Sequence, residues 1–338
     1  MQRIYSLFLL IMVVFCVAGC GMIEKNTAEK LGLKFSNDGR ILMYCPQNFS
    51  GELVSPSCVE KIGSRAFFYN TAIEKVIIPE GVTIIEKDAF YGCKNLKQVV
   101  LPAGLIEIGE SAFYGCVNLT DIKIPDTVRK IDNYAFYNCK SLKNIQIPDS
   151  VLSIGYSSFN WCTGLNEITI PANVNSIKGG AFANIKSVKV APDNKYFKLD
   201  RYGALYDRNG TVILYLPPSF KGVYNIPDGV TEIGSCAFEA CKKMQNVKIP
   251  ASVRKISFGA FKMCYDLQKI VIPEGVREIG QYAFMRCTAL EDIKIPASME
   301  NIQSGAFYNC FSLKKVSVPK KTNINPEAFE NKCVVSRM

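Results

Sequence analysis

Apolar and polar residues follow a phrase that recurs along most of the chain with a fixed period of 23 residues. The phrase reads Ile-Pro-x-x-Val-x-x-Ile-x-x-x-Ala-Phe-x-x-Cys-x-x-Leu-x-x-Ile-x-Ile-Pro. Its phenylalanine slot is filled eleven times, at Phe67, Phe90, Phe113, Phe136, Phe159, Phe182, Phe238, Phe261, Phe284, Phe307 and Phe329. A fixed period with the same apolar slots predicts a solenoid with one supersecondary unit per turn.

Within one period, the pattern predicts three short elements. Residues 142–147 alternate apolar and polar and predict a strand that Pro148 ends, because proline cannot donate to a sheet ladder. Val151 and Ile154 predict a second short extended segment or a tight turn, and Ala135-Phe136 a short helical or 3-10 return. The predicted fold is therefore a repeat solenoid with a parallel β-sheet and short turns or 3-10 segments. Turns about 4.8 Å apart would make a rod roughly 50 Å long.

The array is interrupted between Pro171 and Pro227, which lie 56 residues apart instead of 23. Residues 204–227 align without a gap with residues 33–56, at an offset of 171 throughout. Both copies contain a hairpin signal, which is Asp-Gly at Gly39 and Asn-Gly at Gly210. We therefore expect a hairpin cap with six repeats over 33–185, an inserted hairpin module over 186–226, and five repeats with a degenerate C-terminal cap over 227–338.

The second hairpin is rich in aromatic residues that either project as a binding platform or pack onto the adjacent repeat. Packing is the favoured interpretation, because hairpin aromatics usually cover a neighbouring core. The residues concerned are Tyr196, Phe197, Tyr202, Tyr206, Tyr215 and Tyr224.

The N-terminal residues have the pattern of a segment that directs export. A basic start at Arg3 is followed by an apolar run to Val17 and then by Ala18-Gly19-Cys20. This order is typical of a signal peptide over 1–19, and its last residues resemble a bacterial lipobox, in which Cys20 is lipidated. An ordinary signal peptide cleaved near Ala18 is the alternative. We expect a tether over 20–32 and a protein that is anchored by lipid to the outer membrane of the cell envelope. The cell surface and the periplasmic side of that membrane are both kept as alternatives.

Charge and composition exclude several chemistries. Lys and Arg total 40 against 30 Asp and Glu, a net charge of +10, and there is no histidine. Catalytic machinery that depends on histidine is therefore excluded. The positive charge suits anionic partners, although nucleic acid is an improbable partner for an exported chain. No cofactor motif, metal site or catalytic residue is predicted, so we expect a protein that is not an enzyme.

Cysteines recur in one slot, three residues after the phenylalanine. Ile185 fills this slot in the sixth repeat, which indicates an apolar position, and we expect reduced, buried thiols there. A metal ladder is the alternative, but the Cys-x-x-Cys spacing of zinc sites is missing. Cys45 is expected in the core, and a disulfide between Cys45 and Cys58 remains an alternative. Cys236 and Cys333 lie outside the column. The column itself is Cys93, Cys116, Cys139, Cys162, Cys241, Cys264, Cys287 and Cys310.

Two exposed surfaces are candidate binding sites. The outward positions of the predicted sheet are moderately basic, with Lys75, Lys123, Lys189, Lys248, Lys269, Lys294 and Lys315. A second row follows the core phenylalanines as an aromatic stripe, at Tyr91, Tyr114, Tyr137 and Tyr308. The lysine face either binds a partner or is simply solvated. The stripe either contacts sugars or protein or shields the edge of the core.

The Ile-Pro, Val, Ile-Gly, Ala-Phe and Cys slots at a 23-residue period resemble the BspA-like bacterial leucine-rich repeat surface protein family, over roughly residues 33–333. This resemblance implies a curved parallel-sheet solenoid. Some members are associated with adhesion to host extracellular proteins such as fibronectin and fibrinogen. We therefore expect a monomeric adhesin for a host matrix or plasma protein. A structural or assembly lipoprotein of the envelope and a glycan-binding module are the alternatives.

Overall fold

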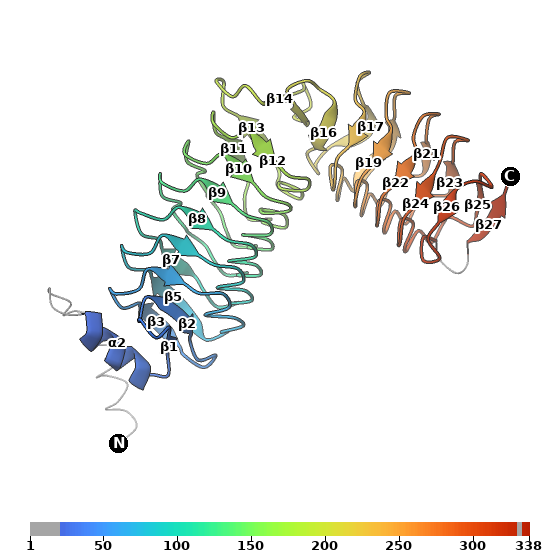
Figure 1. The fold of residues 1–338 in the computed structure, drawn as a ribbon. Coiled ribbons are helices and arrows are strands. Elements are labelled where there is room, and N and C mark those ends of the chain that lie inside the picture. The colour runs from blue at the N-terminus through green and yellow to red at the C-terminus, as the bar shows by residue number, and fades with distance from the viewer. Residues whose placement is uncertain (1–20, 330–332) are drawn as a thin grey trace.

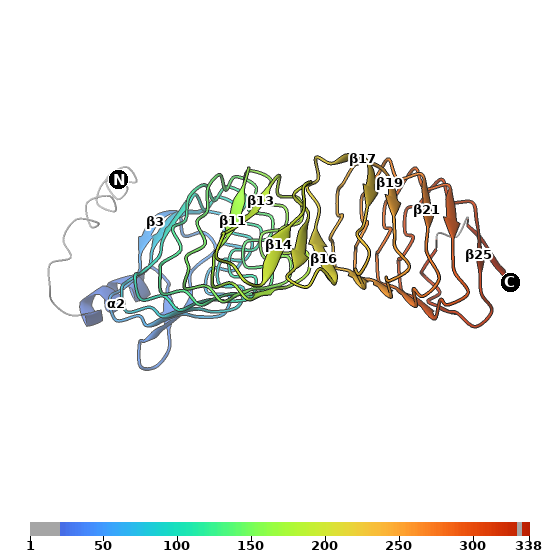
Figure 2. The same cartoon turned by 90° about the horizontal axis from the view of Figure 1, so that it is seen from above.

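The computed structural model describes residues 21–329 and 333–338, which form a β-solenoid of about 13 turns with almost no helix. Two arms meet at an angle, so that the molecule is arch-shaped (Figure 1), and Figure 2 shows the same arms from above. The helix α2 (Gly21–Lys30) lies at one end and the strand β27 (Val334–Arg337) at the other. Within the described ranges, no helix has the length and apolar character needed to cross a membrane. The signal peptide over 1–19 and the lipidation site Cys20 lie outside the described residues.

The first arm contains a continuous sheet of eight strands. An antiparallel pair opens it, and parallel strands of two residues follow at one per turn. Their register is fixed by the repeat, since Ile62 pairs with Ile85 and Ile85 with Ile108. The strands are β1 (Lys34–Phe35), β2 (Ile41–Tyr44), β4 (Lys61–Ile62), β6 (Ile84–Ile85), β8 (Glu107–Ile108), β9 (Lys130–Ile131), β10 (Ser153–Ile154) and β12 (Ser176–Ile177).

The second arm repeats this design. Its eight-stranded sheet also begins with antiparallel strands, so that both expected hairpins are present. The strands are β14 (Phe197–Leu199), β15 (Leu205–Asp207), β16 (Val212–Tyr215), β18 (Glu232–Ile233), β20 (Lys255–Ile256), β22 (Glu278–Ile279), β24 (Asn301–Ile302) and β26 (Asn323–Ile324). We call the surface of these two sheets the ladder face.

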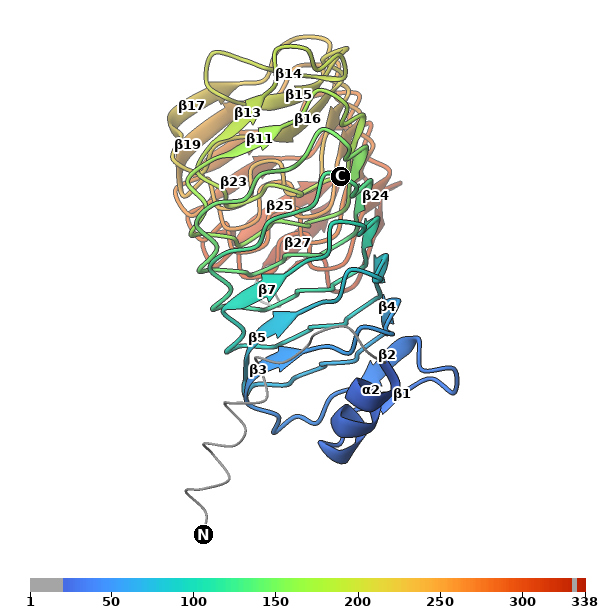
Figure 3. The ribbon, with the colours of Figure 1, turned by 90° about the vertical axis from the view of Figure 1, so that its left-hand side faces the viewer.

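The strands expected before each proline form a second face, which we call the proline face. Figure 3 shows β3, β5 and β7 on one side of the turns, with β2 and β4 on the other. This face is divided into separate sheets of two or three strands. Besides β27 it consists of β3 (Gly51–Val54), β5 (Ile73–Ile77), β7 (Gln98–Val100), β11 (Ile168–Ile170), β13 (Val188–Val190), β17 (Lys221–Asn225), β19 (Lys243–Lys248), β21 (Lys269–Val271), β23 (Asp292–Lys294) and β25 (Lys315–Val318).

The strand predicted over residues 142–147 is wrong, because this segment has no strand hydrogen bonding. The continuous ladder instead runs through the segment that contains Ile154, for which the sequence allowed either an extended segment or a turn. Backbone pairing on the proline face is limited to short sheets, whereas on the ladder face it runs through all eight strands of each arm.

The return segment is a series of tight turns, so the 3-10 alternative is wrong for the described residues. Ala66 N donates to Gly63 O and Phe68 N to Arg65 O, at 3.1 and 3.0 Å. Between these bonds the backbone passes through the left-handed region, with φ of 60° at Arg65. Positive φ interrupts a helix, so each bond closes a separate turn.

The core is built of in-register columns. Phe113 is fully buried, and its ring centroid lies 5.1 Å from that of Phe90 and 5.3 Å from that of Phe136. The cysteine column is buried as expected. Most of its thiols donate to the carbonyl of a phenylalanine 26 residues earlier at 3.0 to 3.2 Å, namely Cys93, Cys116, Cys139, Cys162, Cys264, Cys287 and Cys310.

Cys45 and Cys58 are both free, so the alternative of a disulfide between them is wrong. Cys45 is buried, as expected, and accepts a contact of 3.7 Å from the Asn70 amide. Burial raises the pKa of the Cys45 thiol to about 12. Cys236 is buried and Cys333 half-buried, and both are free.

Candidate functional site

The candidate lysines all lie on the proline face, but they do not form one basic patch. Lys75 pairs with Glu52 at 3.0 Å and Lys189 pairs with Glu167 at 2.9 Å, each bridging neighbouring turns. Lys269 stands beside Asp292 in the strand register. Exposed ion pairs of this kind contribute little stability, yet they neutralise the charge that a partner would meet. The remaining lysines are exposed, namely Lys123, Lys248, Lys294 and Lys315.

The aromatic stripe is a stack of rings along the first arm. The centroids of Tyr91 and Tyr114 are 4.5 Å apart with an interplanar angle of 5°, and those of Tyr114 and Tyr137 are 4.7 Å apart at 12°. Phe68 extends the stack at 5.2 Å from Tyr91. Tyr308 lies in the second arm and is 48% exposed. The structure therefore brings three of the four predicted tyrosines together and leaves Tyr308 apart.

Ring stacking decides what these tyrosines can contact. Both faces of Tyr114 are covered by its neighbours in the stack, so only ring edges and hydroxyls face solvent. Burial, together with the neighbouring Tyr114, raises the pKa of Tyr91 to about 12, and burial also raises the pKa of Tyr137. The phenols of Tyr91 and Tyr137 are therefore neutral at pH 7, and their hydroxyls can donate or accept hydrogen bonds.

More exposed aromatic rings lie on the same turns, next to the Ala-Phe pair. Tyr69 contacts Tyr91 at 5.4 Å and Tyr134 contacts Tyr137 at 6.0 Å between centroids. In the second arm Phe258 contacts Tyr282 at 5.9 Å. The sequence analysis missed this set because its members occupy three different slots of the repeat. We call the whole set the aromatic edge: Tyr69, Tyr91, Tyr114, Tyr134, Tyr137, Tyr156, Phe258, Tyr282 and Tyr308.

Several rings of the aromatic edge are exposed. Exposed fractions are 45% for Tyr69, 38% for Tyr134, 46% for Tyr156 and 43% for Phe258. Exposed aromatic groups gathered on one surface are typical of sites where proteins bind one another. The edge is therefore the best candidate for a functional site on the described chain.

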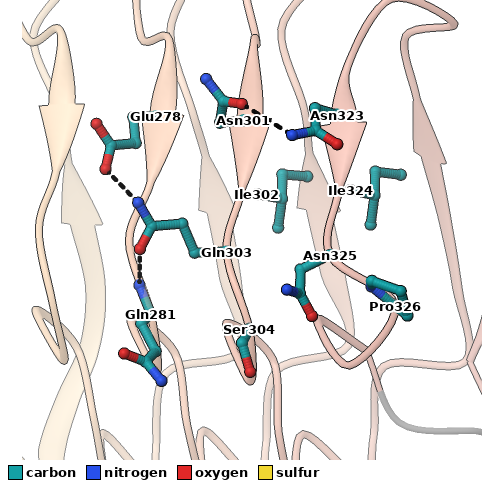
Figure 4. A pocket seen from close by; sticks show the side chains of 10 residues that line it. All are labelled: Glu278, Gln281, Asn301, Ile302, Gln303, Ser304, Asn323, Ile324, Asn325 and Pro326. Atoms are coloured by element: carbon teal, nitrogen blue, oxygen red, sulfur yellow. Dashed lines mark hydrogen bonds between the residues drawn. The ribbon is translucent and has the colours of Figure 1, made fainter.

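The hollows of the surface are weaker candidates for a binding site than the aromatic edge. One of about 590 Å³ lies over β22, β24 and β26 (Figure 4). Its polar side chains are bonded to one another, since Gln303 Nε2 donates to Glu278 Oε1 at 2.7 Å and Asn323 Nδ2 to Asn301 Oδ1 at 3.3 Å. Among the residues that the structure describes, no group of three or more His, Cys, Asp or Glu is placed to hold a metal ion. The hollow therefore lies over a row of polar side chains on the ladder face that already bond to one another.

Comparisons with known proteins agree with this architecture. A profile of the BspA type leucine-rich repeat region matches residues 54–189 and 221–335. A leucine-rich repeat protein from Eubacterium ventriosum is similar in structure, with a TM-score of 0.59, 21% identity, and coverage of 87% of this chain and 91% of that one.

Two further solved structures share the fold. A leucine-rich cell surface protein from Faecalibacterium prausnitzii has a TM-score of 0.54 and 24% identity, over 90% of this chain and 92% of its own. The pneumococcal vaccine antigen PcpA has a TM-score of 0.54 and 21% identity, over 85% and 71%. No curated protein matches the chain in sequence. The profile match covers most of the chain, and the chain belongs to the BspA-type leucine-rich repeat family.

Proposed function

We propose that this protein is a non-catalytic binding protein of the bacterial cell envelope, and that it acts as an adhesin for a host extracellular protein. The observation that carries the proposal is the aromatic edge, where exposed rings gather along one side of the solenoid. Tyrosine is favoured in binding sites because it buries a large area at a low entropy cost and keeps a hydroxyl for specificity.

Family membership supports the non-catalytic part of the proposal, because leucine-rich repeat proteins are generally not enzymes. Family membership also supports a location in the cell envelope, since one structural relative is described as a cell surface protein. The lipobox-like sequence ending at Cys20 provides the means of attachment. We propose anchoring through acyl chains on Cys20 at the outer membrane.

Protein is favoured over sugar as the partner. A sugar ring stacks on a free aromatic face, and the faces within the Tyr91–Tyr114–Tyr137 stack are occupied by one another. Ring edges and hydroxyls, together with the protruding rings of Tyr134 and Tyr156, match the mixed apolar and polar character of a protein surface.

Surface plasmon resonance on immobilised fibronectin and fibrinogen tests this function. We expect the mature chain to bind at least one of the two, and Tyr134→Ser with Tyr156→Ser to weaken that binding about tenfold or more. Tyr196→Ser is the matched control, since Tyr196 is equally exposed at 47% but lies outside the aromatic edge. If the unaltered chain binds neither protein, the proposal of an adhesin for host matrix and plasma proteins is contradicted.

A further inference from the structure

The two arms approach each other closely at the turns that carry the Ala-Phe pair. A Cβ added to Gly179, in the last turn of the first arm, would lie 2.5 Å from the Ser235 Cβ in the first turn of the second arm. A Cβ on Gly180 would lie 3.1 Å from the Cys236 Cβ, and its φ of +74° also favours glycine. Glycine at these two positions lets the backbones of the two arms meet.

A polar cluster lies beside this contact. Asn160 Nδ2, in the first arm, donates to Glu239 Oε2, in the second, at 3.0 Å. Glu239 Oε1 lies 3.0 Å from the Lys262 Nζ, and the Glu239 side chain is completely buried. Asn184 Nδ2 donates to Asn160 Oδ1 at 2.8 Å and so holds the Asn160 amide in place. We call Asn160, Asn184, Glu239 and Lys262 the corner cluster.

The cluster replaces aromatic residues where the two arms meet. The slot after the core phenylalanine is aromatic at Phe68, Tyr91, Tyr114 and Tyr137, but then becomes Asn160 and Ala183. In the second arm the slot starts with Glu239, 171 residues after Phe68 and in the equivalent place of the duplicated module. The small Ala183 stands between Asn160 and Glu239 in the series of turns, and it is buried.

The cores of the two arms also meet at this corner. The Tyr215 ring, in β16 of the second arm, packs in the apolar core of the first arm, and its hydroxyl donates to Ile185 O at 2.7 Å. Tyr206 and Tyr224, by contrast, belong to the core of the second arm. Apolar packing therefore joins the arms, while a directional contact is needed to fix the angle between them.

We propose that the corner cluster, together with the Gly179–Ser235 contact, fixes the angle between the arms, so that the arch is one rigid body. The hydrogen bond from Asn160 to the buried Glu239 carboxylate is the contact that crosses the junction, and it is directional, because separating the arms would leave a buried polar group without its partner. Because the aromatic edge lies on the same turns in both arms, this angle sets the distance between its two halves. The proposal rests on the fold and does not depend on what the edge binds.

Small-angle X-ray scattering of the purified mature chain tests the proposal without any ligand. We expect the unaltered chain to fit a single arch. Asn160→Asp places two carboxylates against each other and should increase the maximum dimension or broaden the distribution of shapes. Combining Asn160→Asp with Glu239→Gln restores a hydrogen bond with its direction reversed, and should return the profile toward that of the unaltered chain.

A second variant approaches the corner through its backbone contact. Gly179→Val should open the angle, because its side chain would occupy the space of Ser235. Gly104→Val is the matched control, since a Cβ at Gly104 would meet only Glu80 O at 3.7 Å. Circular dichroism verifies that each variant is folded. Scattering profiles of Asn160→Asp and Gly179→Val that superimpose on that of the unaltered chain would overturn the proposal.

Discussion

The Asn160 amide and the Glu239 carboxylate form a hydrogen bond of 3.0 Å between residues 79 positions apart, across the junction of the two arms. Each residue occupies the slot that holds an aromatic ring elsewhere in the first arm. The repeat therefore departs from its own pattern at the place where one array meets the next. Buried polar contacts of this kind specify an arrangement, while the apolar columns supply the stability.

Truncation of Glu239 should be costly. Glu239→Ala leaves the buried Asn160 amide without its acceptor and removes the carboxylate partner of Lys262, which is 23% exposed and can still reach water. We expect a loss of about 1 to 3 kcal/mol in the free energy of unfolding, which is the cost of leaving a buried polar group unsatisfied. Denaturation in urea measures it.

A matched control exists within the first arm. Glu110→Ala removes the exposed pair with Lys87, which spans neighbouring turns at 2.9 Å. Its loss should stay within about 0.5 kcal/mol. Equal losses for Glu110→Ala and Glu239→Ala would show that burial of the corner pair has no energetic importance.

The phenylalanine column should dominate stability. Phe136 is fully buried and stacked between Phe113 and Phe159 at 5.3 and 5.4 Å. Phe136→Ala should therefore cost about 3 to 5 kcal/mol in the free energy of unfolding. Phe311→Ala removes an equal side chain that is 59% exposed, and should cost far less. Similar urea midpoints for both variants would contradict the packing described above.

The buried thiols should make the fold sensitive to alkali. The pKa of Cys45 rises from 9.0 to about 12 on folding, so both states are protonated below pH 9 and the group has no effect there. Above pH 9 the unfolded thiol ionises while the folded thiol stays protonated, and stability falls as pH rises toward 12. Burial raises the pKa of Cys116 and Cys139 in the same direction. Urea midpoints at pH 7, 9 and 10.5 should decrease in that order, and a constant midpoint would refute this linkage.

Accessibility of the thiols provides an independent measurement. Iodoacetamide on the native protein at pH 8 should modify half-buried Cys58 before Cys139 and Cys264, which are completely buried. Only thiolates that solvent can reach are alkylated readily. Peptide mapping by mass spectrometry gives the order. Early modification of Cys139 would mean that the column opens in the native state.

The lysines of the proline face should matter less for binding than the aromatic edge. Replacing Lys123, Lys189, Lys248 and Lys294 together with alanine should change affinity for the immobilised host protein less than about twofold, because the proposed binding surface is the aromatic edge and not the proline face, and Lys189 is also paired with Glu167. Loss of binding in this variant, measured at two salt concentrations, would move the site to the proline face.

The sequence predicts most of the architecture because its period places the same side chains in register. The phenylalanine and cysteine columns and the parallel strands follow from that period, and both hairpins follow from the module that is duplicated at an offset of 171. The continuous ladder through Ile154 does not, because two faces of each turn are extended and local pattern cannot show which one keeps backbone pairing. The contact between Glu239 and Asn160 could not be predicted either, since the two residues lie 79 positions apart and belong to different arms.

The candidate binding surfaces could also be predicted only where their residues share one slot of the repeat. Tyr91, Tyr114 and Tyr137 share one slot in consecutive repeats, and their stacking follows from that. Tyr308 shares the slot but belongs to the other arm. Tyr134 and Tyr156 occupy neighbouring slots, so only the left-handed turns, with φ of 57° at Tyr134, bring them to the same edge.

Protease treatment of intact cells, followed by detection of this protein with an antibody, tests the central claim most directly. An adhesin anchored at Cys20 must expose its solenoid to the outside, so we predict cleavage at the cell surface while a periplasmic control protein stays intact. Protection of the protein until the cells are broken would contradict the adhesin, and would favour a structural or assembly role within the envelope.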